Sequence, residues 1–163
     1  MGRFVTDGML GKLTRWLRLA GCDVVYVGDL NLPPERQDSF LIDLARSEDR
    51  ELLTSDLGLH IKARKSGVRS TFIGPGEVVS QMVELCRKTG RRIDLDPEKA
   101  RCPACNGELV RAEKKSVAEV VPRRVLEEQD EFWRCKSCGK AYWKGKQWRS
   151  ILKVVKRYNQ LMK

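Results

Sequence analysis

A chain of 163 residues with 41% hydrophobic residues is long enough for one ordinary domain, or for a smaller domain with an appended module. It contains no apolar run of the length of a membrane span, and its start reads as a strand without a signal-peptide pattern, so we expect a cytoplasmic protein with no membrane partner. The formal charge of +10 is uneven: residues 1–97 carry 15 Lys and Arg against 14 Asp and Glu, whereas residues 98–163 carry 17 against 8. This excess favours a polyanionic partner such as nucleic acid over a merely solvated basic face.

The first 90 residues alternate between predicted strands and predicted helices. Strands are expected at 3–6, 23–27, 51–54 and 68–73, and helices at 10–20, from near 38 onward, at 57–65 and at 77–88. A strict alternation of this kind is typical of a parallel sheet with helices on both faces. The predicted fold class is therefore α/β.

Residues 90–101 are polar and include Pro97, as expected of a linker. We predict three parts: a sheet domain at 1–92, a cysteine module at 99–149 and a basic amphipathic helix at 150–163.

Acidic residues follow the predicted strands. Asp7 follows the first strand, Asp56 follows the third, and Asp38 is expected to open the helix after the second. Because the strands run in parallel, these acids would meet at one edge of the sheet, where a hard cation such as Mg²⁺ or Mn²⁺ would relieve their repulsion. Aspartate is also a common helix N-cap, so each acid taken singly has a purely structural explanation.

Basic residues lie on the helix that starts beside Asp7. Lys12 and Arg15 would flank a substrate held at that edge, and Arg18 lies further along the same helix. Each of the three is equally compatible with an ordinary solvent-facing cation.

Two CxxC pairs define the second module. They are formed by Cys102 and Cys105, and by Cys135 and Cys138. Two residues between thiolates allow both sulfurs to reach one tetrahedral Zn²⁺, and four thiolates leave no open coordination position. We therefore predict a structural zinc ribbon, with a hairpin between the two pairs, rather than disulfides or a redox site.

Aromatic and basic residues are interleaved from 133 to 149, which suits stacking on unpaired bases together with phosphate contacts. Some of these rings are equally expected in the small core of the ribbon. Together with the helix at 10–20, the pattern predicts as RNA contacts Lys12, Arg15, Arg18, Lys140, Trp143, Lys144, Lys146, Trp148 and Arg149.

Two stretches, FVTDGMLGKLTRWLRLAG at 4–21 and DSFLIDLARSEDRELLTSDLGL at 38–59, resemble the Mut-7 C-terminal RNase family. The resemblance covers nearly the whole chain, including the paired cysteines. It implies a PIN-like fold with a C-terminal zinc ribbon and metal-dependent RNA cleavage. The acids of the family fall on Asp7, Asp38 and Asp56.

These observations predict a PIN-like endoribonuclease with a carboxylate-bound Mg²⁺ or Mn²⁺. Lys12 and Arg15 would assist cleavage, and the zinc ribbon would bind RNA. The alternative is a non-catalytic RNA-binding or ribosome-associated factor with a degenerate PIN-like domain. Ribosomal RNA or the ribosome is a candidate partner in both cases, and the oligomeric state is left open. A toxin-type PIN nuclease is a third possibility, which the large basic ribbon disfavours.

Overall fold

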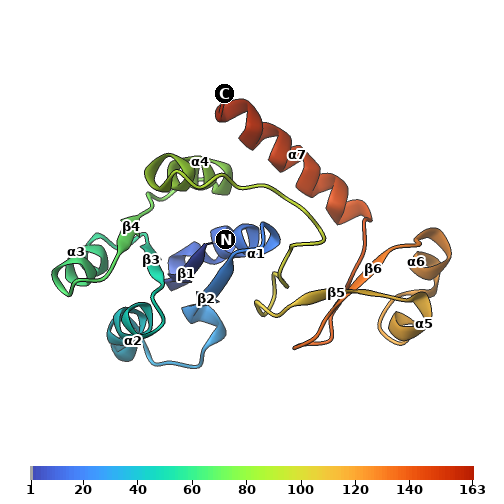
Figure 1. Ribbon diagram of the computed structural model, residues 1–163, viewed down its shortest axis with the longest axis horizontal. Coiled ribbons are helices and arrows are strands. Elements are labelled where there is room, and N and C mark those ends of the chain that lie inside the picture. The colour runs from blue at the N-terminus through green and yellow to red at the C-terminus, as the bar shows by residue number, and fades with distance from the viewer. Residues whose placement is uncertain (1) are drawn as a thin grey trace.

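The structure, a computed structural model, describes residues 2–163 and confirms the predicted α/β fold (Figure 1). The strands β1 (Arg3–Thr6), β2 (Asp23–Tyr26), β3 (Glu51–Thr54) and β4 (Ser70–Phe72) form a parallel sheet of order β2-β1-β3-β4. They alternate with the helices α1 (Gly11–Leu19), α2 (Pro34–Ser47), α3 (Leu57–Lys65) and α4 (Val78–Thr89). Short 3₁₀ turns, η1 (Gly8–Leu10) and η2 (Val27–Asp29), follow β1 and β2.

The central strands are buried on both faces of the sheet. Phe4 and Leu53 pack against α1 and α4, whereas their neighbours Val5 and Leu52 pack against α2 and α3. Successive strand residues point to opposite faces, so an uninterrupted apolar strand needs helices on both sides. A crossover helix lies between successive strands, so the strands run in the same direction, and the parallel pairing of β1 with β3 brings their carboxyl ends next to each other.

Helix α2 begins at Pro34, before the predicted start near Asp38. Proline is well suited to the first turn of a helix, where its missing N–H is not needed. The expectation that Asp38 opens this helix was therefore wrong, and Asp38 lies in the second turn of α2.

The cysteine module contains an antiparallel sheet of β5 (Leu109–Ala112), β6 (Phe132–Cys135) and β7 (Ala141–Tyr142). Two short helices, α5 (Lys114–Val117) and α6 (Arg123–Glu128), lie between β5 and β6. The segment between the cysteine pairs is therefore more than the simple hairpin that was expected. Its added helices give the module a core of its own around Val117, Val121 and Phe132.

Helix α7 (Lys146–Leu161) connects the two parts of the molecule (Figure 1). It starts next to the cysteine module and packs on α4, where Tyr158 is fully buried and its hydroxyl accepts a hydrogen bond from the backbone N–H of Ile93 (3.1 Å). It begins ahead of the predicted boundary at residue 150. None of the helices in residues 2–163 combines the length and the apolar character needed to cross a membrane.

Candidate active site and metal centre

Asp7 lies directly after β1, and its buried carboxylate is held by residues from β3 and the loop after it. Oδ2 accepts hydrogen bonds from the Thr54 hydroxyl and from the backbone N–H of Ser55 (3.0 Å), and Oδ1 accepts one from the N–H of Met9 (2.9 Å). Asp7 is only 6% exposed, yet it forms no ion pair within residues 2–163. A buried carboxylate that has only neutral hydrogen-bond donors around it, and no cationic side chain, is stabilised when a metal cation binds beside it.

Asp56 lies after β3 and is joined to Asp7 through Thr54. The Thr54 hydroxyl donates to Asp7 and accepts a hydrogen bond from the backbone N–H of Asp56 (2.9 Å). Asp56 Oδ1 also accepts the N–H of Leu59 (3.1 Å), so this residue is the N-cap of α3. Sequence reasoning missed Thr54, although its place at the end of the LLT strand was a usable signal.

Asp38 is half-buried in α2 and makes no side-chain hydrogen bond or ion pair within the described chain. The structure brings Asp7 and Asp56 to neighbouring strand ends. Within residues 2–163, the four cysteines lie close enough together to bind one metal ion. Asp7, Asp38 and Asp56 do not form such a cluster in this part of the chain.

The three basic residues of α1 have different environments. Lys12 and Arg15 are exposed, as predicted, whereas Arg18 is only 2% exposed. Its guanidinium donates to the carbonyl oxygens of Val24 (2.9 and 3.0 Å) and Pro103 (3.1 Å). It also pairs with Asp29 at 2.8 Å. The prediction that Arg18 contacts RNA was therefore wrong, because its side chain joins α1 to β2 and to the cysteine module.

The four cysteines have the geometry of a tetrahedral zinc site. All four sulfurs lie within 4.8 Å of one another, with 3.7 Å between Cys102 and Cys138 and 3.4 Å between Cys105 and Cys135. Zn–S bonds of about 2.3 Å require sulfur separations of about 3.8 Å. At Gly107, an added Cβ would lie 2.6 Å from the Cys135 sulfur, so the site leaves no room for a side chain at that position. The cysteine cluster therefore fits one structural zinc ion.

Backbone donors favour the thiolate at one of these cysteines. Burial raises the pKa of Cys135, but hydrogen bonds from the backbone N–H groups of Cys138 and Ser137, together with those of the Cys105 and Cys138 thiols, lower it to about 7, whereas burial raises the pKa of Cys105 and Cys138. The Tyr142 hydroxyl lies 3.1 Å from the Cys102 sulfur, and burial together with this contact raises the pKa of Tyr142, so the hydroxyl keeps its proton near neutral pH. Backbone N–H groups of this kind stabilise a thiolate, which is the form of cysteine that binds metal.

The first cysteine pair is attached to the edge strand β2 through Asn106. Its side chain donates to Asp23 (2.7 Å) and accepts the backbone N–H of Val24 (2.9 Å). Burial raises the pKa of Asp23, but hydrogen bonds from Arg50 and Asn106 lower it below its ordinary value. The stabilisation is therefore fully present above the unfolded pKa of about 3.9 and is lost as the pH falls through the lower folded value.

Removing this attachment gives a first prediction. Asn106 has φ of 70°, so Asn106→Gly removes both side-chain hydrogen bonds without backbone strain. We expect a loss of about 1–2 kcal/mol in the free energy of unfolding at pH 7. Asn106→Asp should lose more, since it places a second carboxylate beside Asp23. Denaturant titration measures both values, and unchanged midpoints would show that the attachment contributes no stability.

The predicted aromatic contacts are partly structural. Trp143 packs against Phe132, with 6.4 Å between ring centroids, and lies against the module core. Lys144 lies over the rings of Trp133 (5.6 Å) and Trp148 (5.9 Å). It also pairs with Glu131 at 3.4 Å. These rings and Lys144 therefore hold the module and the start of α7 together.

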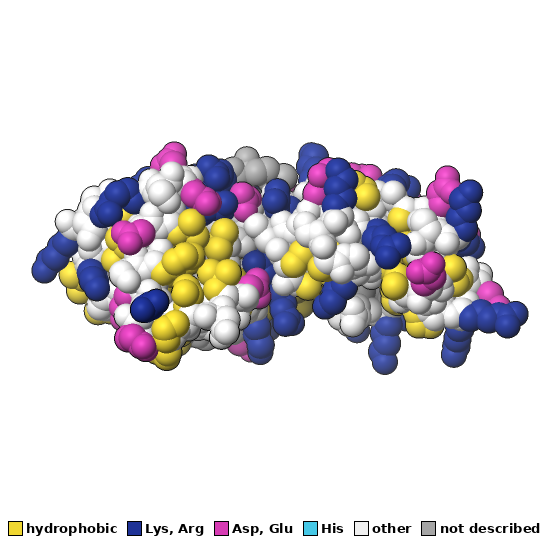
Figure 2. All heavy atoms as spheres, turned by 90° about the horizontal axis from the view of Figure 1, so that it is seen from below, with side chains coloured by type: hydrophobic (Ala, Val, Ile, Leu, Met, Phe, Trp, Pro, Cys, Tyr) yellow, Lys and Arg dark blue, Asp and Glu magenta, His cyan; other side chains and the backbone are white. Residues whose placement is uncertain are grey.

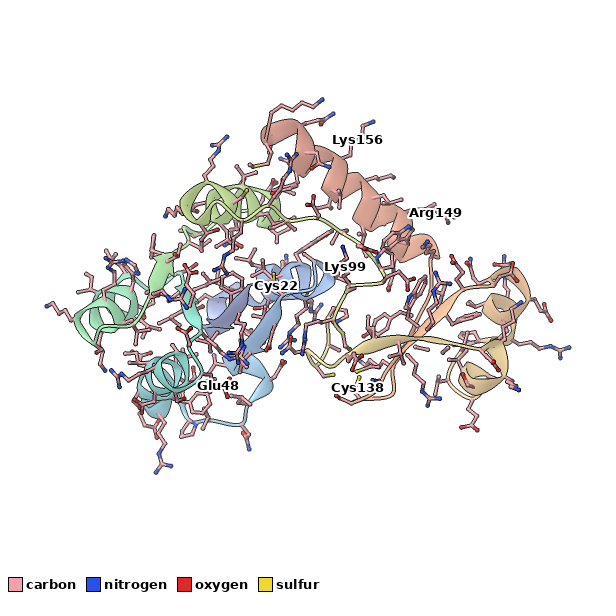
Figure 3. All side chains as sticks on the ribbon, in the orientation of Figure 1. Cys22, Glu48, Lys99, Cys138, Arg149 and Lys156 are labelled. Carbon is pink, nitrogen blue, oxygen red and sulfur yellow. The ribbon has the colours of Figure 1, made fainter. Side chains whose placement is uncertain are left out.

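The remaining predicted cations are exposed. Lys140 follows the second cysteine pair, and Lys146 and Arg149 lie in the first turns of α7 rather than in the ribbon. Figure 3 shows Arg149 and Lys156 along the outer side of α7. Lys and Arg side chains also project along the lower margin of the cysteine module in Figure 2. The sequence-level charge excess is thus a surface property of this half of the molecule.

A family model described as the Mut7-C RNAse domain matches residues 2–155. Comparisons with curated proteins and with solved structures give no significant match. The family match includes the sheet, the acids at its edge, all four cysteines and most of α7. The protein thus carries a ribonuclease-type domain, whose substrate class is RNA. Because the match spans nearly the whole chain, this protein belongs to the Mut7-C RNAse domain family.

Proposed function

We propose that the protein is a metal-dependent endoribonuclease of PIN-like type, with its active site at the carboxyl edge of the parallel sheet. Asp7, Asp38 and Asp56 would hold Mg²⁺ or Mn²⁺, for which carboxylate oxygens are suitable ligands. When bound, such an ion activates water and stabilises the charge on a phosphate being cleaved.

The observation that carries this proposal is the pair of acids at the ends of β1 and β3. Asp7 and Asp56 follow neighbouring strands, share the Thr54 hydroxyl and have no cationic partner within residues 2–163. By contrast, other acids of the sheet domain, such as Asp23 and Asp29, are in ion pairs with buried arginines. Carboxylates left without cations at a ligand-binding edge favour a metal site.

The protein's own residues would position the substrate. Lys12 and Arg15 project from α1, which starts just after the turn that follows Asp7. Cations in this place steady the phosphate backbone and stabilise negative charge that develops during cleavage. The basic surface of the ribbon and α7 adds affinity with little sequence readout, because phosphate contacts carry no base information.

One observation favours the non-catalytic alternative. Asp7 and Asp56 both accept backbone N–H groups as helix caps, at Met9 and Leu59. Under that alternative the acids serve only the fold, and the protein is an RNA-binding or ribosome-associated factor. The two functions therefore predict different effects on RNA cleavage for a substitution that removes the charge of an acid but keeps its capping hydrogen bond.

Asp56→Asn makes that distinction, because asparagine caps helices as well as aspartate does. We expect RNA affinity to be kept and the cleavage rate of an end-labelled, partly single-stranded RNA in Mn²⁺ or Mg²⁺ to fall at least about 100-fold. Asp43→Asn is the matched control, since Asp43 is exposed on α2 and pairs only with Arg46. Equal cleavage by the wild type and both variants would show that Asp56 is not an active-site residue. RNA binding without cleavage by the wild type would favour the non-catalytic RNA-binding function.

A further inference from the structure

A groove separates α1 from the zinc ribbon and ends beside the proposed active site. It has a volume of about 490 Å³, with α1 on one wall and the cysteine module on the other. Tyr26, at the end of β2, lines the groove and donates a hydrogen bond from its hydroxyl to the carbonyl of Gly8 (2.9 Å). Gly8 directly follows Asp7, so the groove leads to the carboxyl edge of the sheet.

Both walls of the groove carry exposed cations. Lys12 and Arg15 lie on the α1 wall, one helical turn apart, and Lys140 lies on the ribbon wall. Within residues 2–163, none of the three side chains forms an ion pair or donates a hydrogen bond. The one acid that lines the groove, Asp29, is neutralised by Arg18. The groove is therefore positively charged and complementary to a polyanion.

The position of the ribbon wall is fixed by buried contacts. Arg18 is nearly inaccessible and donates to the carbonyl of Pro103 (3.1 Å), while the backbone N–H of Arg101 donates to the carbonyl of Arg18 (2.8 Å). Asn106 fastens the same cysteine pair to β2. These contacts hold the two walls at a set separation, so the groove is a built feature of the fold.

We propose that this α1–ribbon groove holds the RNA backbone next to the point of cleavage, with phosphates contacted by Lys12 and Arg15 on one side and by Lys140 on the other. The inference rests on the proposed ribonuclease function and assigns the zinc ribbon a direct part in substrate binding. The ribbon would then complete the substrate site of the sheet domain, in addition to adding charge at a distance.

Binding of a fluorescently labelled single-stranded RNA to zinc-loaded protein, without Mg²⁺ or Mn²⁺, tests the groove separately from catalysis. We expect Lys12→Ala, Arg15→Ala and Lys140→Ala each to weaken binding several-fold and to reduce the slope of log K against log salt by about 0.7. Lys62→Ala and Lys65→Ala, both on α3, remove the same charge away from the groove and the ribbon and should bind as the wild type does.

Ala104 offers a second test inside the groove. It lines the ribbon wall between two zinc ligands, so Ala104→Glu places a negative charge among the cations, whereas Ala104→Gln adds the same bulk without charge. We expect Ala104→Glu to weaken binding much more than Ala104→Gln does.

The outcomes separate the groove from the nuclease. The proposal that RNA binds in the α1–ribbon groove would be overturned by any of three results. These are equal losses of affinity in the groove variants and the controls, equal binding by the two Ala104 variants, or no RNA binding by the wild type. Loss of RNA affinity in the groove variants alone, together with no cleavage of any RNA by the wild type, would support RNA binding in the groove and refute the proposed nuclease activity.

Discussion

Cys102→Ser is expected to release zinc and to unfold most of the cysteine module. Cys102 is fully buried, and the module has only a small core around Val117, Val121 and Phe132, so we expect a bound metal to supply much of its stability. Structural zinc sites contribute about 10 kcal/mol or more to folding. The variant should also bind RNA more weakly, because one wall of the α1–ribbon groove is lost.

Tryptophan fluorescence and zinc content measure this result. Three of the four tryptophans, Trp133, Trp143 and Trp148, lie in the module or at the start of α7, so emission reports mainly on that part of the molecule. Cys22→Ser is the control, since Cys22 is a half-buried packing residue outside the cluster. Zinc retention and unchanged emission in Cys102→Ser would contradict the predicted site.

Asp7→Asn is expected to reduce cleavage at least about 100-fold, because loss of a metal ligand should cost more than the about 10- to 100-fold that follows loss of a residue orienting such a ligand. It should also lower stability by about 1–3 kcal/mol, because the new amide group faces donors that need an acceptor. The Asp7 carboxylate accepts from the Thr54 hydroxyl and from two backbone N–H groups, and asparagine satisfies only part of this set. Cleavage assays under single-turnover conditions and denaturant titration separate the two effects.

Thr54 provides the matched pair for that experiment. Thr54→Ser keeps the hydroxyl that joins Asp7 to Asp56, whereas Thr54→Val removes it with nearly the same shape. We expect the serine variant to cleave RNA and the valine variant to be about 10- to 100-fold slower.

Full activity in Asp7→Asn, with the RNA still bound, would show that cleavage occurs at a site that does not include Asp7.

Local patterns were sufficient for much of the fold. The bounds of β1, β3 and α3 agree with those predicted, because apolar runs and helical spacing depend only on nearby residues. The two CxxC pairs predicted the cysteine cluster for the same reason, since the short spacing itself sets the positions of the sulfurs.

Long-range contacts explain what the sequence could not predict. Arg18 has the spacing of an exposed helix residue, but it is covered by Pro103, which lies 85 positions away in the chain. Asn106 contacts Asp23 across a similar separation. Helical periodicity places a residue on a side of its helix and does not reveal what lies against that side. The α1–ribbon groove has the same origin, since its walls come from distant segments.

We propose above that this Mut7-C RNAse domain cleaves RNA with a divalent cation held at the carboxyl edge of its sheet. The most direct test is the cleavage rate of an end-labelled single-stranded RNA by zinc-loaded protein as Mn²⁺ or Mg²⁺ is added, without a chelator that would also remove zinc. We expect no cleavage before addition, a cleavage rate that rises and saturates as the cation is added, and no such rise in Asp7→Asn. Full cleavage without an added cation, or none at any concentration while the RNA is bound, would rule out a metal-dependent active site at this edge.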